Sequence, residues 1–429
     1  MASLTRNLCT AVLAGLAVCL AACGTLSRPP DGVLRLADVE VVPAADPRIR
    51  ASDASRLERL AGELASHLQE DQPAAVLALS GGGANGAWGA GVLSGWSDRG
   101  DRPAFAVVTG VSTGALTAPF AFLGPAWDDR LESAYTDGGT QGLVSWRSFA
   151  AFFAPSLFSP ADLREVVERH VTPELLAAVA AEHARGRRLL VATTDLDAQE
   201  TVIWDMGVVA TQGGPQGLVL FRDILVASAS VPGVFPPVLI AGLDEQGRVV
   251  QTMHVDGGVN APFLGVPEGL LDWTPESPVR GTFYVLVNGQ LNRTPRVTGG
   301  RLRDILERSF DSAGKAMLRA QLLATAEFAH RTGMPLYVAA TPPELETSSL
   351  DFDRETMQTL FDAGRRAARG GEAWRRFRAE TLTGEEEEGE AAPRSGGAHL
   401  QPRPVHGGDD DALADGRPDA VDLGGPFGA

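Results

Sequence analysis

Two glycine-rich segments, each directly after a run of apolar residues, constrain the fold of this chain more than any other feature. The segment SGGGANG at 80–86 follows AVLAL at 75–79, and GVSTG at 110–114 follows FAVVT at 105–109. Short apolar runs of this kind are typical of buried parallel strands, and glycines at the end of such a strand are typical of a tight turn into a helix. The pattern predicts successive strand–turn–helix units, and therefore an α/β fold with a mainly parallel central sheet.

The second segment has the pattern of a nucleophile elbow. Ser112 stands midway between Gly110 and Gly114. Glycines at these positions let neighbouring backbone pass close to a sharp strand-to-helix turn, which exposes the serine hydroxyl at the carboxyl edge of the sheet. In the first segment, glycine N–H groups at the start of a helix face a position that favours an anion. Together the two segments predict acyl-transfer chemistry, with a serine nucleophile and a cradle for an anion.

Nucleotide binding is the rival interpretation of the first segment, because 81–86 also matches the GxGxxG fingerprint. A dinucleotide site requires an acidic residue at the end of the second strand. The nearby Asp98 and Asp101 precede that strand, so they fall at the wrong end of the sheet. A phosphate-binding P-loop requires a lysine after the glycines, and the sole lysine of this chain is Lys315. We therefore expect no cofactor, and we expect no metal.

A serine nucleophile needs a base within hydrogen-bond reach. Six of the seven histidines lie before the core strands, within predicted helices or in the C-terminal tail: His67, His170, His183, His330, His399 and His406. The seventh, His254, lies in TMHVDGGV, where alternating residues indicate a strand that runs into a turn at Asp256, Gly257 and Gly258. On a regular strand His254 and Asp256 share one face. The sequence leaves open whether His254 serves a conventional Ser–His–Asp triad or is a buried strand histidine with satisfied hydrogen bonds.

In this order, the motifs resemble those of the patatin-like phospholipase family, whose members use a serine–aspartate dyad without histidine. Segment 81–86 resembles the oxyanion-hole motif, 110–114 the nucleophile motif, and 256–258 the motif of the dyad aspartate. The stretch ASASVPGVFPP at 227–237 resembles the family segment that precedes that aspartate. The resemblance covers about residues 74–265 and implies a patatin-like three-layer α/β/α fold with a mainly parallel central sheet.

The resemblance also implies a site and an activity. The site residues carried over are Ser112 and Asp256 as the catalytic dyad, Gly81, Gly82, Gly83, Ala84 and Gly86 at the oxyanion hole, and Gly110, Gly114, Gly257 and Gly258 as elbow and turn glycines. The implied activity is hydrolysis of lipid acyl esters. One departure is Asn85, which stands where the family often has arginine or lysine. This departure keeps a second hypothesis open, in which the chain is a weak or inactive family member that serves as a binding or scaffold module.

The N-terminus has the pattern of an export signal. The apolar stretch 8–20 is too short to span a bilayer comfortably but suits a secretory leader. It ends in LAAC, which resembles the lipobox of bacterial lipoproteins, and so predicts cleavage after residue 22 and lipidation of Cys23. An ordinary signal peptide with an incidental cysteine is the alternative. Because Gly24 follows the cysteine, the resemblance favours anchoring in the outer membrane of the bacterial envelope.

Composition suggests how the rest of the chain is organised. We expect a tether at 23–55, a hydrolase domain at 56–380 and a disordered, acidic, Gly/Pro-rich tail at 381–429. The formal net charge is −17, and residues 385–429 alone contain eleven acidic residues against three arginines. The mildly acidic remainder lacks the basic footprint that nucleic-acid binding requires, and this balance also argues against simple electrostatic docking on anionic lipid. Further predicted elements are helices at 54–69, from 160, at 174–184 and at 301–332, and strands at 187–194, 200–206 and 336–340.

Overall fold

The computed structural model describes residues 32–33, 46–68, 74–138, 160–244, 246, 248–275, 279–345 and 348–378. The predicted signal peptide at 1–22, the lipidation site Cys23, most of the predicted tether and the predicted tail at 381–429 lie outside these residues. Within the described ranges, no helix combines the length and the apolar character needed to cross a membrane.

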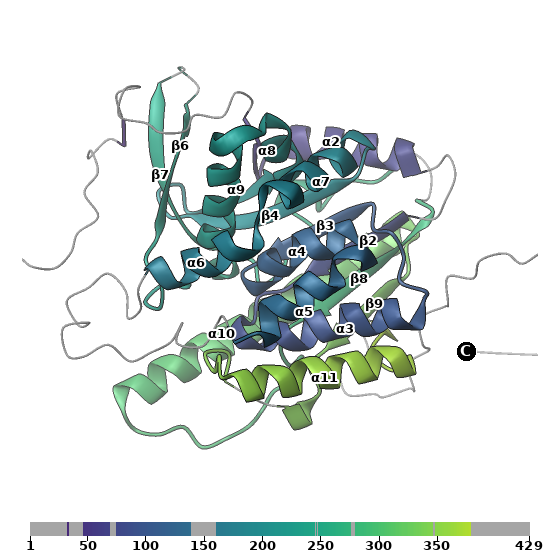
Figure 1. Ribbon diagram of the computed structural model, residues 1–429, viewed down its shortest axis with the longest axis vertical. Coiled ribbons are helices and arrows are strands. Elements are labelled where there is room, and N and C mark those ends of the chain that lie inside the picture. The colour runs from purple at the N-terminus through teal and green to yellow at the C-terminus, as the bar shows by residue number, and fades with distance from the viewer. Residues whose placement is uncertain are drawn as a thin grey trace, which may run out of the picture. The chain divides into compact units, whose positions relative to one another are not determined.

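The centre of the fold is a ten-stranded mixed sheet in the described part of the chain (Figure 1). Its main path runs β1-β5-β4-β3-β2-β8-β9-β10, and β7 joins it by pairing with both β4 and β6. The five strands from β4 to β9 along this path are mutually parallel, and antiparallel pairs lie outside them. The strands are β1 (Arg48–Arg50), β2 (Ala74–Leu79), β3 (Val107–Val111), β4 (Arg188–Asp195), β5 (Glu200–Asp205), β6 (Val238–Leu243), β7 (Val249–Asp256), β8 (Gly281–Val287), β9 (Leu336–Ala340) and β10 (Arg375–Arg376).

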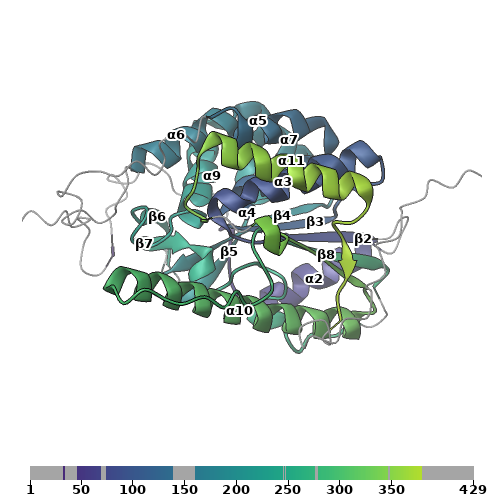
Figure 2. The same cartoon turned by 90° about the horizontal axis from the view of Figure 1, so that it is seen from below.

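Helices cover both faces of this sheet, which gives the three-layer α/β/α architecture (Figure 2). One face is covered by α3 (Gly86–Arg99), α4 (Thr113–Leu123), α5 (Asp128–Thr136), α6 (Pro160–His170), α7 (Pro173–Ala184), α8 (Met206–Gln212), α9 (Gly214–Ser228) and α11 (Arg354–Gly370). The other face is covered by α2 (Ala54–Leu68) and α10 (Leu302–Thr332). Strand β2 shows why both faces must be covered: Leu77 and Leu79 belong to one core cluster and Ala78 to another, because successive strand residues point to opposite faces.

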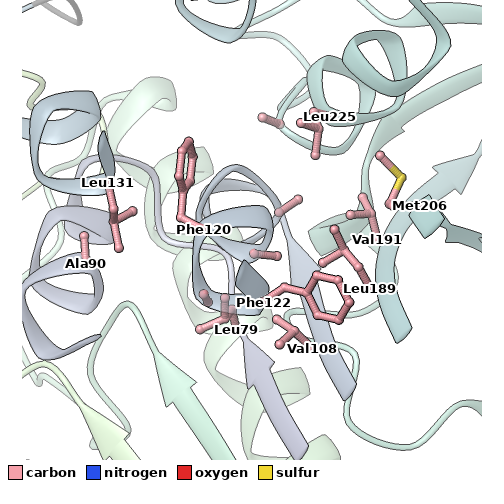
Figure 3. Packing of buried hydrophobic residues seen from close by; sticks show 14 of the residues in the cluster. Leu79, Ala90, Val108, Phe120, Phe122, Leu131, Leu189, Val191, Met206 and Leu225 are labelled. Carbon is pink, nitrogen blue, oxygen red and sulfur yellow. The ribbon is translucent and has the colours of Figure 1, made fainter. Parts of the chain in front are cut away.

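Helix α4, which follows the predicted elbow, is buried on most of its sides. Phe122 of α4 is buried against the strands, where Figure 3 shows its ring near Val108 and Leu189, and Phe120 is buried on the other side of the helix. A helix that is apolar on nearly all sides is stable only inside a core, and each large side chain buried there contributes about 1.5–3 kcal/mol. The packing therefore holds the first turn of α4 in a fixed position.

The predicted elements are confirmed in type, with shifts at their ends. Helix α10 ends where Gly333 adopts a left-handed conformation, and Thr172 caps α7 by accepting from the Leu175 N–H at 3.4 Å. Strand β3 starts two residues later than expected and includes Gly110. The tether predicted at 23–55 is too long, because β1 pairs with β5 and Val33 forms a bridge with Val250. A three-residue edge strand is too short to leave a periodic signal, and only tertiary pairing stabilises it.

Candidate active site

Ser112 occupies a sharp, strained turn between β3 and α4. Its backbone has φ 56° and ψ −127°, a region that residues other than glycine rarely adopt, at a cost of about 1–3 kcal/mol. Two neighbouring glycines make the turn possible by close approach. A Cβ on Gly114 would lie 2.5 Å from the Leu79 carbonyl oxygen, and a Cβ on Gly110 would lie 2.6 Å from that of Gly114. The predicted elbow is therefore present.

Strand register brings Asp256 to the same place. Strand β4 pairs with β3 as far as Val111 opposite Ala192, and the next residue of β4, Thr193, pairs with Asp256 at the end of β7. Strand β7 thus enters beside β4 directly beyond the point where β3 stops. Ser112 begins the turn at that point, so the two predicted dyad residues meet although 144 positions separate them in the sequence.

The Asp256 carboxyl group is buried and held by one oxygen. Its Oδ1 accepts a hydrogen bond from the Gly258 N–H at 2.7 Å, whereas Oδ2 has no hydrogen-bond partner among the described residues. Burial raises the pKa of Asp256 to about 6, and interactions with the Ser112 hydroxyl and the Gly258 N–H oppose that rise. The Ser112 hydroxyl is close enough to affect the pKa, yet it does not meet the geometry of a formed hydrogen bond. Catalytic hydrogen bonds are often loose without substrate.

The two turn glycines after Asp256 have separate tasks. Gly257 and Gly258 begin a short 3-10 turn, Gly257–Val259, and the Gly258 N–H supplies the hydrogen bond to Asp256. A Cβ on Gly257 would lie 2.5 Å from the Ala192 carbonyl oxygen. Gly257 thus allows close packing on β4, while Gly258 orients the carboxyl group.

The end of α9 and the turn after it hold the backbones of both dyad residues. The Ser228 hydroxyl accepts from the Ser112 N–H at 3.1 Å and donates to the Ala192 carbonyl at 2.7 Å. The carbonyl of Ser230 accepts from the Asp256 N–H at 3.0 Å. The sequence motif at 227–237 marked this segment without giving it a role. Its physical role is to fix the distance between the nucleophile and the carboxyl group.

The glycine segment at 81–86 offers fewer free N–H groups than expected. Three of the five predicted donors already bond to protein oxygens: Gly81 to Pro262 at 3.0 Å, Ala84 to Ser349 at 2.9 Å, and Gly86 to the carbonyls of its own turn. Between described residues, no hydrogen bond uses the N–H of Gly82 or Gly83. The candidate oxyanion hole is therefore narrowed to Gly82 and Gly83. The reason is that the buried backbone N–H groups of the loop need hydrogen-bond acceptors within the protein as the chain enters α3.

Tertiary contacts set the shape of this loop. Gly83 has φ 57°, and a Cβ there would lie 2.0 Å from the Ser349 carbonyl oxygen. Asn288, directly after β8, donates from its backbone N–H to the Ser80 hydroxyl and from Nδ2 to the Ser80 carbonyl, both at 2.8 Å. Gly81 lies against the nucleophile, since its Cβ would be 3.0 Å from that of Ser112. Asn288 is not among the predicted site residues, because no local motif marks it.

An apolar pocket opens at Ser112. It has a volume of about 860 Å³ including its mouth. Its lining comprises Gly83, Ser112, Thr113, Leu116, Phe120, Ala134, Tyr135, Leu163, Val166, Val167, His170, Val171, Leu225, Ala229, Val231, Phe235, Leu350, Phe352 and Met357. Burial lowers the pKa of His170, so its imidazole stays neutral near pH 7. Such a lining suits a hydrocarbon chain whose ester group reaches the serine.

His254 fits the structural role left open by the sequence. Its ring is buried, with Nδ1 3.0 Å from the Thr193 hydroxyl and Nε2 2.8 Å from the Thr252 hydroxyl. The Thr193 hydroxyl also accepts from Trp204, which leaves its own proton for His254. Burial lowers the pKa of His254 to about 3. Both ring nitrogens are thus used by threonines, and a neutral histidine held in this way is not a base for Ser112.

One family model matches the part of the chain that carries these motifs. Residues 77–266 match the family model described as Patatin-like phospholipase. A solved structure described as the crystal structure of VipD from Legionella pneumophila is similar with a TM-score of 0.27 and 12% identity, over 72% of this chain and 68% of that one. No curated protein matches the sequence. The chain contains a patatin-like phospholipase domain, which spans residues 77–266.

Proposed function

We propose that this protein is a serine acyl-ester hydrolase that acts on lipid substrates through a dyad of Ser112 and Asp256. The family match supports a lipid acyl hydrolase in general. The observation that carries the finer proposal is the pairing of a strained elbow serine with a buried carboxyl group whose Oδ2 has no partner among the described residues. Ser112 lines an apolar pocket, where an acyl ester fits better than a charged substrate.

The chemistry follows from this arrangement. Asp256 takes the Ser112 proton as Oγ attacks the ester carbonyl carbon, and the resulting oxyanion accepts hydrogen bonds from Gly82 and Gly83. One such donor lowers a barrier of this kind by about 3 kcal/mol. The tetrahedral intermediate collapses, the alcohol leaves with the proton held by Asp256, and an acyl-serine remains. Water, deprotonated by Asp256, then releases the fatty acid and restores Ser112.

The raised pKa of Asp256 suits this work. A general base acts best when its pKa lies near the working pH, because it is then both ionised and basic. With a pKa of about 6, Asp256 is mostly ionised at pH 7 and is a stronger base than an exposed aspartate. Burial therefore supplies basicity that most hydrolases obtain from histidine.

We also propose that the protein is anchored to the bacterial envelope, in the outer membrane, through lipidated Cys23. The support is the LAAC sequence at the end of the apolar leader. An anchor at the membrane would place the pocket beside its lipid substrates.

The first prediction tests the nucleophile. A fluorophosphonate probe should label the protein, and Ser112→Ala should remove both the labelling and the hydrolysis of a soluble short-chain ester. Ser94→Ala is the matched control, because Ser94 is also a buried serine but donates only within α3, to Ala90 at 3.1 Å. Unchanged labelling of Ser112→Ala would exclude Ser112 as the nucleophile. A parent protein that neither reacts nor hydrolyses would instead support the binding-module hypothesis.

A further inference from the structure

Helix α10 is packed along only half of its length. It has 31 residues, and its buried positions begin at Leu318 and recur at helical spacing through Leu322, Thr325, Ala329 and Thr332. Of the side chains described between 302 and 317, none is buried. The C-terminal half thus anchors the helix to the sheet. Packing on the sheet does not account for the N-terminal half.

Topology places that free half beside the active site. Helix α10 leads into β9, which is parallel to β8, so the helix runs opposite to the strands. At 1.5 Å per residue it is about 46 Å long, whereas the seven residues of β8 span about 23 Å. Because its C-terminal end lies at the start of β9, the excess length extends beyond the carboxyl edge of the sheet, where Ser112 also lies. Figure 2 shows α10 extending past the strands at one end.

The free half presents large apolar side chains to solvent. Leu302 is 71% exposed, Ile305 47%, Leu306 49% and Phe310 76%. Residues three, four and eight apart share one side of a helix, so these four form one stripe. In the loop before the helix, Val297 is 99% exposed. A contiguous exposed apolar stripe of this size is typical of a binding surface and not of a solvated helix.

Positive charge surrounds this stripe in an otherwise acidic protein. Residues 291–317 contain six arginines or lysines against three acidic residues, although the whole chain has a formal net charge of −17. Arg293, Arg296 and Arg301 are exposed. The preceding loop is tied to the helix, because Lys315 donates to the Thr294 hydroxyl at 2.8 Å and Arg308 donates to the Thr294 carbonyl. Loop and helix therefore form one cationic, apolar surface.

We propose that residues 291–317, here called the α10 extension, bind the surface of an anionic lipid bilayer. Leu302, Leu306 and Phe310 insert among the acyl chains, and the exposed arginines contact lipid phosphates, as in other interfacial basic helices. Bound in this way, the extension holds the carboxyl edge of the sheet, where Ser112 lies, near the lipid. The supply of lipid substrate to that pocket rests on the proposed function, whereas the binding itself does not.

The second prediction measures insertion at one position. In a full-length chain with Cys9→Ser, Cys19→Ser and Cys23→Ser, Phe310→Cys is labelled with an environment-sensitive fluorophore and mixed with vesicles. We expect a blue shift with phosphatidylcholine vesicles that contain phosphatidylglycerol, and a much weaker one with phosphatidylcholine alone. Ser312→Cys is the control, since it is exposed and lies about 200° around the same helix from Phe310, so it points away from Phe310 and should respond much less.

Because the fluorophore responds only to its own surroundings, its shift distinguishes lipid binding by the α10 extension from lipid binding elsewhere on the chain. No shift at position 310, or equal shifts at 310 and 312, would overturn the proposal. So would a shift that appears without vesicles as protein concentration rises and coincides with dimer formation by light scattering, because the stripe would then bind a second copy.

A second test compares ester hydrolysis by two variants, each with one exposed leucine replaced. Leu306→Ser should reduce hydrolysis of an ester in anionic vesicles about five- to tenfold and leave hydrolysis of a soluble ester unchanged. Leu271→Ser should change neither rate, because Leu271 is similarly exposed but lies at the other end of α10, where its carbonyl accepts from Arg331. Equal loss in both variants would contradict the proposal. A parent that hydrolyses neither ester would refute the proposed function, while the fluorescence result would still decide whether the extension binds lipid.

Discussion

Burial of Asp256 lowers the stability of the fold and makes its carboxylate a stronger base. Its carboxyl group is buried, has one oxygen without a partner among the described residues, and has its pKa raised to about 6 by that burial. Ser112 adds strain through its positive φ. Both features are unfavourable to folding, and both place a basic group beside the Ser112 hydroxyl that lines the pocket. Sites of this kind are stabilised by their surroundings, here by Ser228 and Ser230.

The third prediction is that Asp256→Asn loses activity and gains stability. An amide cannot take the serine proton, so kcat/KM should fall nearly as far as in Ser112→Ala. Because the folded-state pKa of Asp256 is raised from 3.8 to about 6, its stabilising contribution is complete below pH 3.8 and is lost as the pH rises through 6. The variant does not titrate, so relative to the parent it should gain up to roughly 3 kcal/mol between pH 4 and pH 8.

Urea unfolding at the two pH values and kcat/KM from pH 5 to pH 8 check this prediction. The parent kcat/KM should decline below about pH 6, where Asp256 becomes protonated. His254→Gln is the control and should keep most activity, because both ring nitrogens of His254 already bond to threonines. Severe inactivation by His254→Gln, with a mild effect of Asp256→Asn, would establish a histidine triad instead.

At the scale of elements, the site depends on where strands and helices stop. Strand β7 can approach β4 because β3 ends at Val111, and α9 ends where the Ser228 hydroxyl reaches the Ser112 N–H and the Ser230 carbonyl reaches the Asp256 N–H. Helix α10 has the opposite character, since it continues far beyond the sheet it covers. Element length therefore determines both the geometry of the dyad and the surface next to it.

The fourth prediction compares the two halves of α10. Leu322→Ala should reduce the free energy of unfolding by about 2–5 kcal/mol, because Leu322 is fully buried against the sheet. Leu306→Ala should change it by no more than about 0.5 kcal/mol, since Leu306 is half exposed and alanine is an equally good helix former. Denaturant melts of both variants at one pH provide the measurement. A loss of 2 kcal/mol or more for Leu306→Ala would show that the extension is packed in the free protein.

At the scale of the whole molecule, charge is distributed unevenly. The segment 385–429 contributes a large share of the negative charge, whereas the α10 extension is positive. An anchor at Cys23 and a basic interfacial surface would act together, because a single lipid signal gives only marginal binding and a second stabilises it.

The fifth prediction concerns that anchor. Mass spectrometry of the mature protein from a Gram-negative host should find the first 22 residues removed and an acylated Cys23 at the new N-terminus. Cys23→Ser should prevent acylation. An unmodified N-terminus at a different residue would sink the lipoprotein proposal.

Much of the architecture could be predicted from local patterns. Apolar runs followed by glycines marked β2 and β3, spacing marked α10 and β9, and the motif order pointed to Ser112 and Asp256. Local patterns were less informative about backbone hydrogen bonds. Gly81, Ala84 and Gly86 looked equivalent to Gly82 and Gly83 as donors, and only the positions of Pro262 and Ser349 distinguish them. Strand β1 and Asn288 were missed because their roles depend on partners far away in the sequence.

By itself, the sequence determined which residues are chemically equipped to act and which segments can form strands and helices, because periodicity and glycine placement are local properties of the chain. Tertiary structure alone decided the rest. Register placed Asp256 beside the end of β3, burial raised its pKa and lowered that of His254, and the mismatch between a 31-residue helix and short strands left an apolar, cationic half of α10 exposed. These are properties of distance and environment, which arise only when segments remote in the sequence are brought together.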